Sequence, residues 1–266
     1  MPPVPVAVVG NLSLDLVDEA PPRPGGPPLY AGRVLARLGV PSVVRAKAAE
    51  ADRVRLLPAL GALGVRVEWR AGASTATYAF SYDGDARVME VRALGSPWSP
   101  ADVAGLRGDW VHVGALFRGE FPAETLAALS EHARVSFDGQ GLVRPARVGP
   151  LELEPESDTA FLRYVSVLKL SEEEALALVG RLDERPLSEL GVPEVVVTLG
   201  SRGCLVVARH RVVHVPAEPL TGIDPTGAGD AFAAAYMVER SRRHAPHAAA
   251  KRATRFVGAL LARTRR

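Results

Sequence analysis

Short apolar segments alternate along this chain with segments of helical pattern, and this alternation constrains the fold more than any other feature. The strand-like segments are rich in valine, and Ala-rich or amphipathic segments separate them. Alternation of this kind is typical of a parallel sheet covered by helices on both faces. The predicted strands are 4–10, 43–46, 110–113, 135–138, 165–168 and 195–199, and the predicted helices are 29–38, 51–63, 123–132, 172–180, 231–240 and 248–264.

Two segments break the alternation. Residues 76–82 and 87–92 flank Asp-Gly-Asp at 83–85, a pattern that predicts a β-hairpin with a short turn. A small β element inserted early in an α/β chain suits a lid over the carboxyl ends of the strands, where ligands gather in such folds. We therefore expect one domain over residues 1–266, with lid elements within about 11–30 and 72–95.

Composition excludes several functional classes. The 266 residues carry 32 basic and 30 acidic side chains, a net charge near +2 that gives no reason to expect a nucleic-acid partner. No apolar stretch approaches the roughly 20 residues that a membrane span needs. The single cysteine, Cys204, excludes an intrachain disulfide framework and a Cys-rich metal site. The N-terminus has no signal-peptide pattern, so we expect a cytoplasmic protein.

The strongest chemical signal is the segment of residues 224–230, which reads Asp-Pro-Thr-Gly-Ala-Gly-Asp. Its glycines allow positive φ and a close approach of the backbone to a ligand, and an apolar helix follows whose free N–H groups attract anions. A carboxylate beside a bound phosphate makes chemical sense as a base that takes a proton from an attacking hydroxyl, which assigns that role to Asp230. Helix capping explains Asp230 but not the Gly-Ala-Gly before it.

This segment resembles the C-terminal signature D-T-x-G-A-G-D of the ribokinase-like (PfkB) family of sugar and nucleoside kinases, with Pro225 where the family most often has Thr. The resemblance implies a ribokinase-like three-layer α/β/α sandwich with a mostly parallel sheet, Mg-ATP as donor, and Asp230 as catalytic base. It further implies that backbone N–H groups stabilise charge on the transferred phosphoryl group, those of Gly227, Ala228 and Gly229. Asp224 and Thr226 would by the same analogy help form a monovalent-cation site for K⁺, and Thr226 would with Gly227 and Gly229 also contact ATP.

An acceptor site is predicted in the first third of the chain. Asn11 and Asp15 follow the first strand, and the resemblance implies that Asp15 accepts hydrogen bonds from sugar hydroxyls; a simple turn residue is the alternative. The pair Gly25 and Gly26 precedes an Ala-rich helix, as in the first family signature, and can act as a lid hinge or as a flexible loop. Tyr30 stands in the region where the family commonly has Asn and offers an aromatic wall.

Two further segments match the family in order. Residues 198–203 resemble T-x-G-x-x-G, which implies that Thr198, Gly200 and Gly203 lie near the donor phosphates; a plain β-turn is the alternative. Residues 169–174 stand at the N-x-x-E motif, which places Lys169 at the ATP site and implies that Glu174 organises Mg²⁺ through water. Ser171 replaces the Asn of that motif, and with Glu174 it also has the spacing of a capping box that needs no metal.

Residues 138–144 occupy the place of the family's D-x-N-x-R. Gln140 offers a donor and an acceptor suited to hydroxyl groups, and Arg144 could reach the donor phosphates or the acceptor. With Tyr30 and the sequence His-Val-Gly at 112–114, this variant looks more like the branch that contains myo-inositol kinases and related polyol or nucleoside kinases.

The sequence thus predicts an ATP-dependent kinase that phosphorylates a hydroxyl of a small sugar or polyol, myo-inositol-like or ribose-like. Three alternatives stay open. A nucleoside kinase would stack a base on a lid aromatic such as Tyr30; a 2-keto-3-deoxygluconate-type kinase would need a cation such as Arg87, Arg92 or Arg118; and a regulatory homologue would have lost activity. If the lid is one hairpin, its exposed edge would be protected by homodimerisation.

Overall fold

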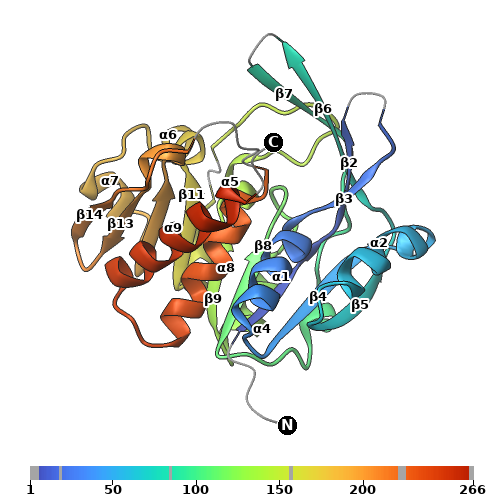
Figure 1. Ribbon diagram of the computed structural model, residues 1–266, viewed down its shortest axis with the longest axis horizontal. Helices are drawn as coiled ribbons and strands as arrows, with labels where there is room; N and C mark the ends of the chain where they lie inside the picture. The colour runs from blue at the N-terminus through green and yellow to red at the C-terminus, as the bar shows by residue number, and fades with distance from the viewer. Residues whose placement is uncertain (1–5, 18–19, 84–85, 156–157, 221–225, 264–266) are drawn as a thin grey trace.

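The computed structural model describes residues 6–17, 20–83, 86–155, 158–220 and 226–263, which form two sheets (Figure 1). The strands of the main sheet are β1 (Val6–Asn11), β4 (Ser42–Ala49), β5 (Arg66–Gly72), β8 (Trp110–Gly114), β9 (Arg134–Asp138), β11 (Val167–Ser171), β12 (Glu194–Thr198), β13 (Cys204–Ala208) and β14 (Arg211–Val215). Their order is β14-β13-β12-β11-β9-β8-β1-β4-β5. All neighbouring pairs from β12 to β5 are parallel, and β13 and β14 continue the sheet antiparallel. The predicted mostly parallel sheet is confirmed.

Helices cover both faces of this sheet, as the alternation predicts. The first face carries α1 (Pro27–Leu38), α2 (Arg53–Gly61), α8 (Ala228–Ser241) and α9 (Pro246–Ala262), and the second carries α3 (Pro100–Val103), α4 (Ala123–Ser130), α5 (Gln140–Val143), α6 (Glu172–Val179) and α7 (Glu184–Ser188). The side chains of β1 alternate between the two cores: Val6 and Val8 pack under the first set of helices, and Ala7 and Val9 under the second. Figure 1 shows α8 and α9 side by side across the near face.

Several element boundaries differ from the predictions for local reasons. The helix predicted at 29–38 begins at Pro27, because proline is favoured in the first turn, and it ends at Gly39 with a φ of 61°. The helix predicted at 231–240 begins three residues earlier, at Ala228. The segment predicted as one helix at 51–63 splits into a 3-10 turn at Glu50–Asp52 and α2. No helix in the described ranges is both long and apolar enough to cross a membrane.

The lid is a second sheet, larger than the predicted hairpin. It contains β2 (Ser13–Val17), β3 (Arg23–Gly25), β6 (Ala76–Asp83), β7 (Ala86–Ala93) and β10 (Gly149–Pro150), in the order β10-β7-β6-β2-β3. The predicted pairing of β6 with β7 is confirmed, and its turn residues 84–85 lie outside the described residues. Because β10 and β3 cover both sides of the central strands, the premise of a lone hairpin does not hold, and homodimerisation through the lid stays a prediction.

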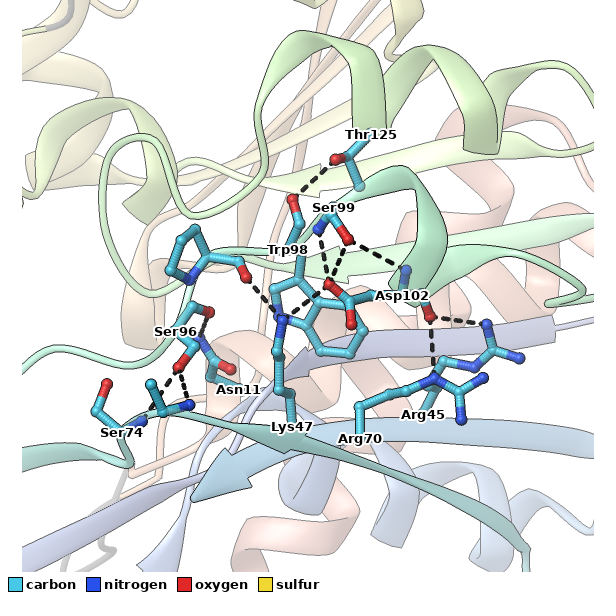
Figure 2. Close-up of polar contacts among 12 residues, drawn as sticks. Asn11, Arg45, Lys47, Arg70, Ser74, Ser96, Trp98, Ser99, Asp102 and Thr125 are labelled. Atoms are coloured by element: carbon cyan, nitrogen blue, oxygen red, sulfur yellow. Dashed lines mark hydrogen bonds and ion pairs between the residues drawn. The ribbon is translucent and has the colours of Figure 1, made fainter. Parts of the chain in front are cut away.

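Side-chain hydrogen bonds connect the chain segments that pass between the two sheets (Figure 2). The Ser96 hydroxyl accepts the N–H groups of Ala73 and Ser74, and its carbonyl accepts the Asn11 side-chain amide at 2.9 Å. The segments that enter the lid at β2 and β6 are therefore joined to the segment that leaves it after β7. Next to them, Lys47 Nζ donates to Pro97 O at 2.7 Å and to Asp102 Oδ2 at 2.9 Å. We call these contacts the hinge cluster.

Candidate active site

Two cavities lie on either side of the start of α8. The first, of about 130 Å³, opens between the lid and the main sheet, and we call it the lid cavity; the second, of about 190 Å³, lies between α8, α9 and the loops after β12 and β14, and we call it the helix cavity. Gly227 and Asp230 line the lid cavity, whereas Ala228 and Gly229 line the helix cavity. Residues 227–230, at the start of α8, therefore form part of the wall between the lid cavity and the helix cavity.

The two glycines at the start of α8 are required by close contacts. Gly227 caps the helix with a φ of 76°, and a Cβ there would lie 2.3 Å from Cδ1 of Tyr30. A Cβ at Gly229 would lie 2.9 Å from Nζ of Lys169. Because the helix begins at Ala228, the N–H groups of its first turn lack partners within the helix and carry the positive end of its dipole. The two glycines therefore allow the backbone at the start of α8 to lie against the ring of Tyr30 and the ammonium group of Lys169.

Asp230 is buried in this first turn. Its side chain is 9% exposed, and Oδ1 has no hydrogen-bond partner among the described residues. Burial raises the pKa of Asp230 well above the usual range for an aspartate, and the nearby carboxylate of Asp138 raises it further, against the opposing pull of Lys169 and Arg144. A carboxyl group with a raised pKa and an unsatisfied oxygen is chemically suited to accept a proton from a ligand in the lid cavity.

A buried polar cluster lies beneath Asp230. One ligand-type atom each of His112, Asp138 and Asp230 lies within 4.8 Å of the others. Lys169 Nζ donates to Asp138 Oδ2 at 3.2 Å, and Asp138 Oδ1 accepts the N–H of Gln140 at 3.1 Å. Such spacing would suit a metal ion, but Lys169 already brings a positive charge into the cluster.

The protonation states in this cluster follow from burial and charge. Burial lowers the pKa of His112 to about 4, although Asp138 opposes this, so the ring is neutral near pH 7. Burial also disfavours the charged form of Lys169, but Asp138, Glu174 and Asp230 outweigh it and raise the pKa of Lys169 above its usual value. The cluster therefore combines a neutral imidazole with an ammonium group held among carboxylates.

Sequence reasoning missed Asp138 and His112 as parts of the site. Asp138 ends β9 and His112 lies within β8, and the parallel pairing of these strands brings them together. The available signal for Asp138 was its position at the carboxyl end of a central strand, where ligands collect in parallel sheets. For His112 the signal was weaker, because a single buried histidine within a strand is usually a core residue.

The lid cavity gathers most of the residues predicted to bind an acceptor. Ser13 Oγ donates to Asp15 Oδ1 at 2.8 Å, and the Tyr30 hydroxyl lies 3.5 Å from Asp15 Oδ2. Gln140 also lines the cavity, and its Oε1 has no partner in the described part of the protein. Buried polar atoms without protein partners are uncommon and point to a polar ligand. The opposite wall is apolar and comes largely from the lid: Tyr78, Phe80, Met89 and Leu116.

Two predicted residues, Asn11 and Thr226, lie differently from expectation. Asn11 does not line the lid cavity, because it is fully buried and its amide is used in the hinge cluster. Thr226, predicted at the ATP site and at a monovalent cation, lines the lid cavity. Arg144, expected at the donor phosphates or at the acceptor, also lines the lid cavity, on the acceptor side. Asp224, predicted to help hold a monovalent cation, lies outside the described residues, as does Pro225.

Close packing accounts for the glycine pair before α1. A Cβ at Gly25 would lie 2.3 Å from Asp15 Oδ2. Gly26 has a φ of 94°, and a Cβ there would lie 2.6 Å from the carbonyl oxygen of Asn11. Both glycines thus let the start of α1 approach β2 closely, and Gly26 itself lines the lid cavity. Steric fit therefore explains why both positions are glycine, a reason different from the hinge and the flexible loop considered in the sequence analysis.

The helix cavity contains the three residues predicted near the donor phosphates. Thr198 lies at the end of β12, where its hydroxyl donates to Leu170 O at 3.2 Å, and Gly200 and Gly203 follow in the next turn. A Cβ at Gly203 would lie 2.0 Å from Val215 O, so only glycine fits there. The remaining wall is mainly apolar, with Phe232, Val257 and Leu261 among its side chains.

The capping box predicted at the start of α6 is present. Ser171 Oγ accepts the N–H of Glu174 at 3.1 Å, and Glu174 Oε2 accepts the N–H of Ser171 at 2.8 Å. Glu174 is 4% exposed, and its charge contributes to the raised pKa values of Lys169 and Asp230. The capping interpretation is therefore confirmed, and a role for Glu174 toward a metal stays a prediction.

The fold and these contacts define a class of α/β protein. Its members have a β-sheet lid and two cavities that meet at the N-terminus of a helix, where anions are attracted. A family model described as pfkB family carbohydrate kinase matches residues 12–264. The chain belongs to the PfkB family of carbohydrate kinases, as its sequence motifs indicated.

Curated relatives are moderately similar to this chain. It is 31% identical to a fructokinase of Salmonella thompson over 150 residues, which cover 52% of this chain and 67% of that protein. It is 25% identical to the ribokinase of Bacillus subtilis (strain 168) over 254 residues, which cover 88% of this chain and 84% of the relative. The matched regions span about half of two other fructokinases, 48% in Salmonella typhimurium and 45% in Klebsiella pneumoniae.

Solved structures share the fold over nearly the whole chain. A pyrophosphate-dependent kinase in the ribokinase family, complexed with a pyrophosphate analog and myo-inositol, superposes with a TM-score of 0.85 at 23% identity, covering 97% of this chain and 95% of that one. A fructokinase from Vibrio cholerae O395, bound to fructose, ADP and calcium, has a TM-score of 0.73 at 21% identity, with 99% and 94% covered. The ribokinase-like fold is therefore confirmed.

Proposed function

We propose that this protein is an ATP-dependent kinase that transfers the γ-phosphoryl group to a hydroxyl of a small sugar or polyol. The observation that carries the proposal is the division of residues 227–230 between the two cavities. A phosphoryl group passing from the helix cavity to the lid cavity would cross the positive end of α8, which stabilises its charge. In this proposal the whole chain, residues 1–266, acts as one domain.

The acceptor occupies the lid cavity. Asp15 accepts hydrogen bonds from its hydroxyls, Gln140 offers a further polar contact, and the lid aromatics cover its apolar face. Asp230 Oδ1, which has no partner among the described residues, takes the proton of the attacking hydroxyl. The lid excludes water, which favours transfer to the acceptor over hydrolysis. This assignment makes Asp230 the catalytic base.

The donor occupies the helix cavity. Its apolar wall suits the flat face of a purine, while Thr198 and the turn from Gly200 to Gly203 lie where phosphates would reach toward Gly229. Lys169 supplies a positive charge beside Gly229. Mg²⁺ bound there would neutralise charge on the donor phosphates, and Glu174, buried near Lys169, is the residue that would hold it through water. Asp224 and Thr226 remain the proposed ligands of a monovalent cation.

Pyrophosphate is a second candidate donor. Lys169 places an ammonium group beside Gly229, where it would neutralise the phosphates of ATP or of pyrophosphate equally well. The neighbour with the TM-score of 0.85 is described as pyrophosphate-dependent and as a complex with myo-inositol. The apolar helix cavity favours ATP instead, because pyrophosphate has no surface that would use it.

The lid cavity contains a residue that would suit each of the two alternative acceptors, a sugar acid and a nucleoside. A keto-sugar acid needs a cation, and Arg144 lines the lid cavity. Of the arginines first considered, Arg92 pairs with Glu90 and Arg118 donates to Glu154 O, and the side chain of Arg87 lies outside the described residues. A sugar acid kinase would therefore use Arg144, and a nucleoside kinase would use Tyr30.

The proposal is tested by donor consumption with Mg²⁺ and K⁺ present. ATP and pyrophosphate are each offered with myo-inositol, ribose, fructose, 2-keto-3-deoxygluconate, adenosine and cytidine. Asp230→Asn serves as the blank, and Asp183→Asn, at an exposed ion pair with Arg181, is the matched control. We expect one acceptor to be turned over by wild type and control and to be lost in Asp230→Asn, where removal of a general base costs about 10²- to 10⁴-fold. An Asp230→Asn variant with near-normal turnover would remove Asp230 from its role.

A further inference from the structure

Asp138 connects the two cavities through its two carboxylate oxygens. The side chain is completely buried at the end of β9. Oδ2 accepts from Nζ of Lys169, which lies against Gly229 in the wall of the helix cavity. Oδ1 accepts the N–H of Gln140, the first residue of α5 and part of the wall of the lid cavity. One rigid group thus contacts an element of each cavity.

We propose that Asp138 is a positioning residue for phosphoryl transfer, which holds the Lys169 ammonium at Gly229 and away from Asp230 while it fixes Gln140 against the acceptor. This inference rests on the function proposed above. The role differs from that of Asp230, because Asp138 acts through its neighbours and does not line either cavity.

The need for such a residue follows from the burial of Lys169, which is 4% exposed. A buried ammonium requires a carboxylate, since an unpaired buried charge is strongly unfavourable. Asp230 lies within reach of the same cluster, because its carboxylate has an oxygen within 4.8 Å of one of Asp138. Without Asp138, Lys169 would turn to Asp230 and occupy the oxygen that the acceptor needs.

Among the residues that the structure describes, the surroundings of Asp230 offer no other carboxylate placed to perform this separation. Besides Asp138, the charges of Lys169, Arg144 and Glu174 act on Asp230 in the described part of the chain. Tyr30 approaches from α1, and His112 from β8 is neutral near pH 7. Glu174 attracts Lys169 as well, but its carboxylate accepts the N–H of Ser171 through Oε2. Asp138 is thus the carboxylate that contacts the ammonium directly.

A set of kinetic variants separates the two contacts of Asp138. Asp138→Asn keeps an oxygen for the Gln140 N–H but loses the charge that holds Lys169, so kcat should fall on the order of 10²-fold while KM for the acceptor changes little. Asp138→Ala removes both contacts and should raise that KM as well. Asp183→Asn, the same change at an exposed ion pair, should alter neither constant.

A double-mutant cycle with Lys169→Met tests whether Asp138 acts through Lys169. In the Lys169→Met background, Asp138→Asn should slow the enzyme little further, because there is no ammonium left to hold. Equal losses in both backgrounds would overturn the proposal, and so would an Asp138→Asn single variant with unchanged kcat. The double variant carries no unpaired buried ammonium, so if Asp138→Asn does not fold, a large further loss of kcat in the double variant relative to Lys169→Met would still overturn the proposal.

Titration of the Asp230 carboxyl by carbon NMR gives a readout that needs no turnover. Asp138→Asn should lower the pKa of Asp230, and it should lower it more when Lys169 is present than in the Lys169→Met background, because the freed ammonium moves to Asp230. Equal shifts in both backgrounds would refute the inference. If wild type turns over no acceptor with either donor, the proposed function fails, while this titration still decides whether Asp138 keeps Lys169 from Asp230.

Discussion

The ring of Tyr30 lies directly against the backbone of Gly227, so that a single added methyl group at Gly227 would come within 2.3 Å of Cδ1. The Tyr30 hydroxyl lies 3.5 Å from Asp15 Oδ2, and burial, with the charge of Asp15, raises the pKa of Tyr30. One side chain of α1 therefore links the proposed acceptor carboxylate to the start of α8.

Gly227→Ala should slow phosphoryl transfer and destabilise the fold. The alanine would need a φ of 76° and would collide with Tyr30, so Tyr30 or the start of α8 must shift. We expect a loss of about 1–3 kcal/mol in the free energy of unfolding and a clear fall in kcat. Gly61→Ala is the control, since a Cβ there, at the end of α2, meets nothing within 4 Å and the residue lines neither cavity. Chemical denaturation and steady-state kinetics measure both, and an active, stable Gly227→Ala would contradict this steric argument.

The pH dependence of kcat/KM should report the ionisation of Asp230. A base must be deprotonated to act, and burial together with Asp138 raises the pKa of Asp230, so activity should rise with pH. The midpoint of this rise should lie well above the value near 4 of an ordinary aspartate. A pH profile of the purified enzyme measures it, with donor and acceptor whose own groups do not titrate in that range. Full activity maintained down to about pH 4 would show that Asp230 has no raised pKa in the free enzyme.

Ser171→Ala and Glu174→Gln should separate capping from metal binding. Ser171→Ala loses the side-chain cap of α6 and should cost about 1 kcal/mol of stability, with no change in the Mg²⁺ dependence. Glu174→Gln keeps an oxygen for the Ser171 N–H but loses the charge, so it should raise the Mg²⁺ concentration needed for half-maximal rate. Thermal melts and Mg²⁺ titrations of the rate distinguish the two. Identical Mg²⁺ curves for Glu174→Gln and wild type would leave Glu174 with capping alone.

Lys47→Met should weaken the hinge cluster. The change removes the bonds of Nζ to Pro97 O and Asp102 Oδ2 and the contact of the ammonium with the Trp98 ring, 5.2 Å from its centre. We expect a loss of about 1–3 kcal/mol, because both partners lose a charged hydrogen bond. Arg53→Met, at the exposed pair with Glu50, should cost at most about 1 kcal/mol. Urea denaturation compares them, and equal effects would mean that Lys47 contributes no more than a surface ion pair.

Glu120 should make stability depend on pH. This side chain is fully buried, and burial raises its pKa to about 8 against the hydrogen bonds from backbone N–H groups, including that of Leu116. The folded protein then keeps a proton that the unfolded chain releases near its ordinary pKa of 4.5. The free energy of unfolding should therefore fall as pH rises from about 4.5 to about 8 and level off above that. Glu120→Gln should flatten this slope in urea titrations, and an unaltered slope would assign it to other groups.

The sequence allowed the central fold to be predicted because its signals are local. Buried parallel strands such as β1 and β12 form continuous apolar runs, and α6 is bounded by a recognisable capping box at Ser171 and by Gly180. β5 was missed because it is a half-exposed edge strand with charged residues, and β3 and β10 because three and two residues are too short for a pattern.

The site was predictable where a motif marks it and not where distant residues decide it. Gly227 to Asp230, Asp15 and Thr198 lie at the cavities as their motifs indicated. Asn11 was predicted to bind the acceptor, but its amide bonds to Ser96, 85 positions away along the chain, and no local pattern reveals such a partner. Asp138 likewise gains its role only through the pairing of β9 with β11.

The hinge cluster determines how the lid can change. Since the Ser96 hydroxyl and carbonyl hold the chain at Asn11, Ala73 and Ser74 together, the chain segments next to β2, β6 and β7 are held together beside the main sheet. Replacements on the inner face of the lid, at Tyr78, Phe80 or Met89, would then reshape the wall of the lid cavity while leaving the start of α8 untouched. Under the function proposed above, such replacements would change which acceptor is bound and would leave the residues of phosphoryl transfer as they are.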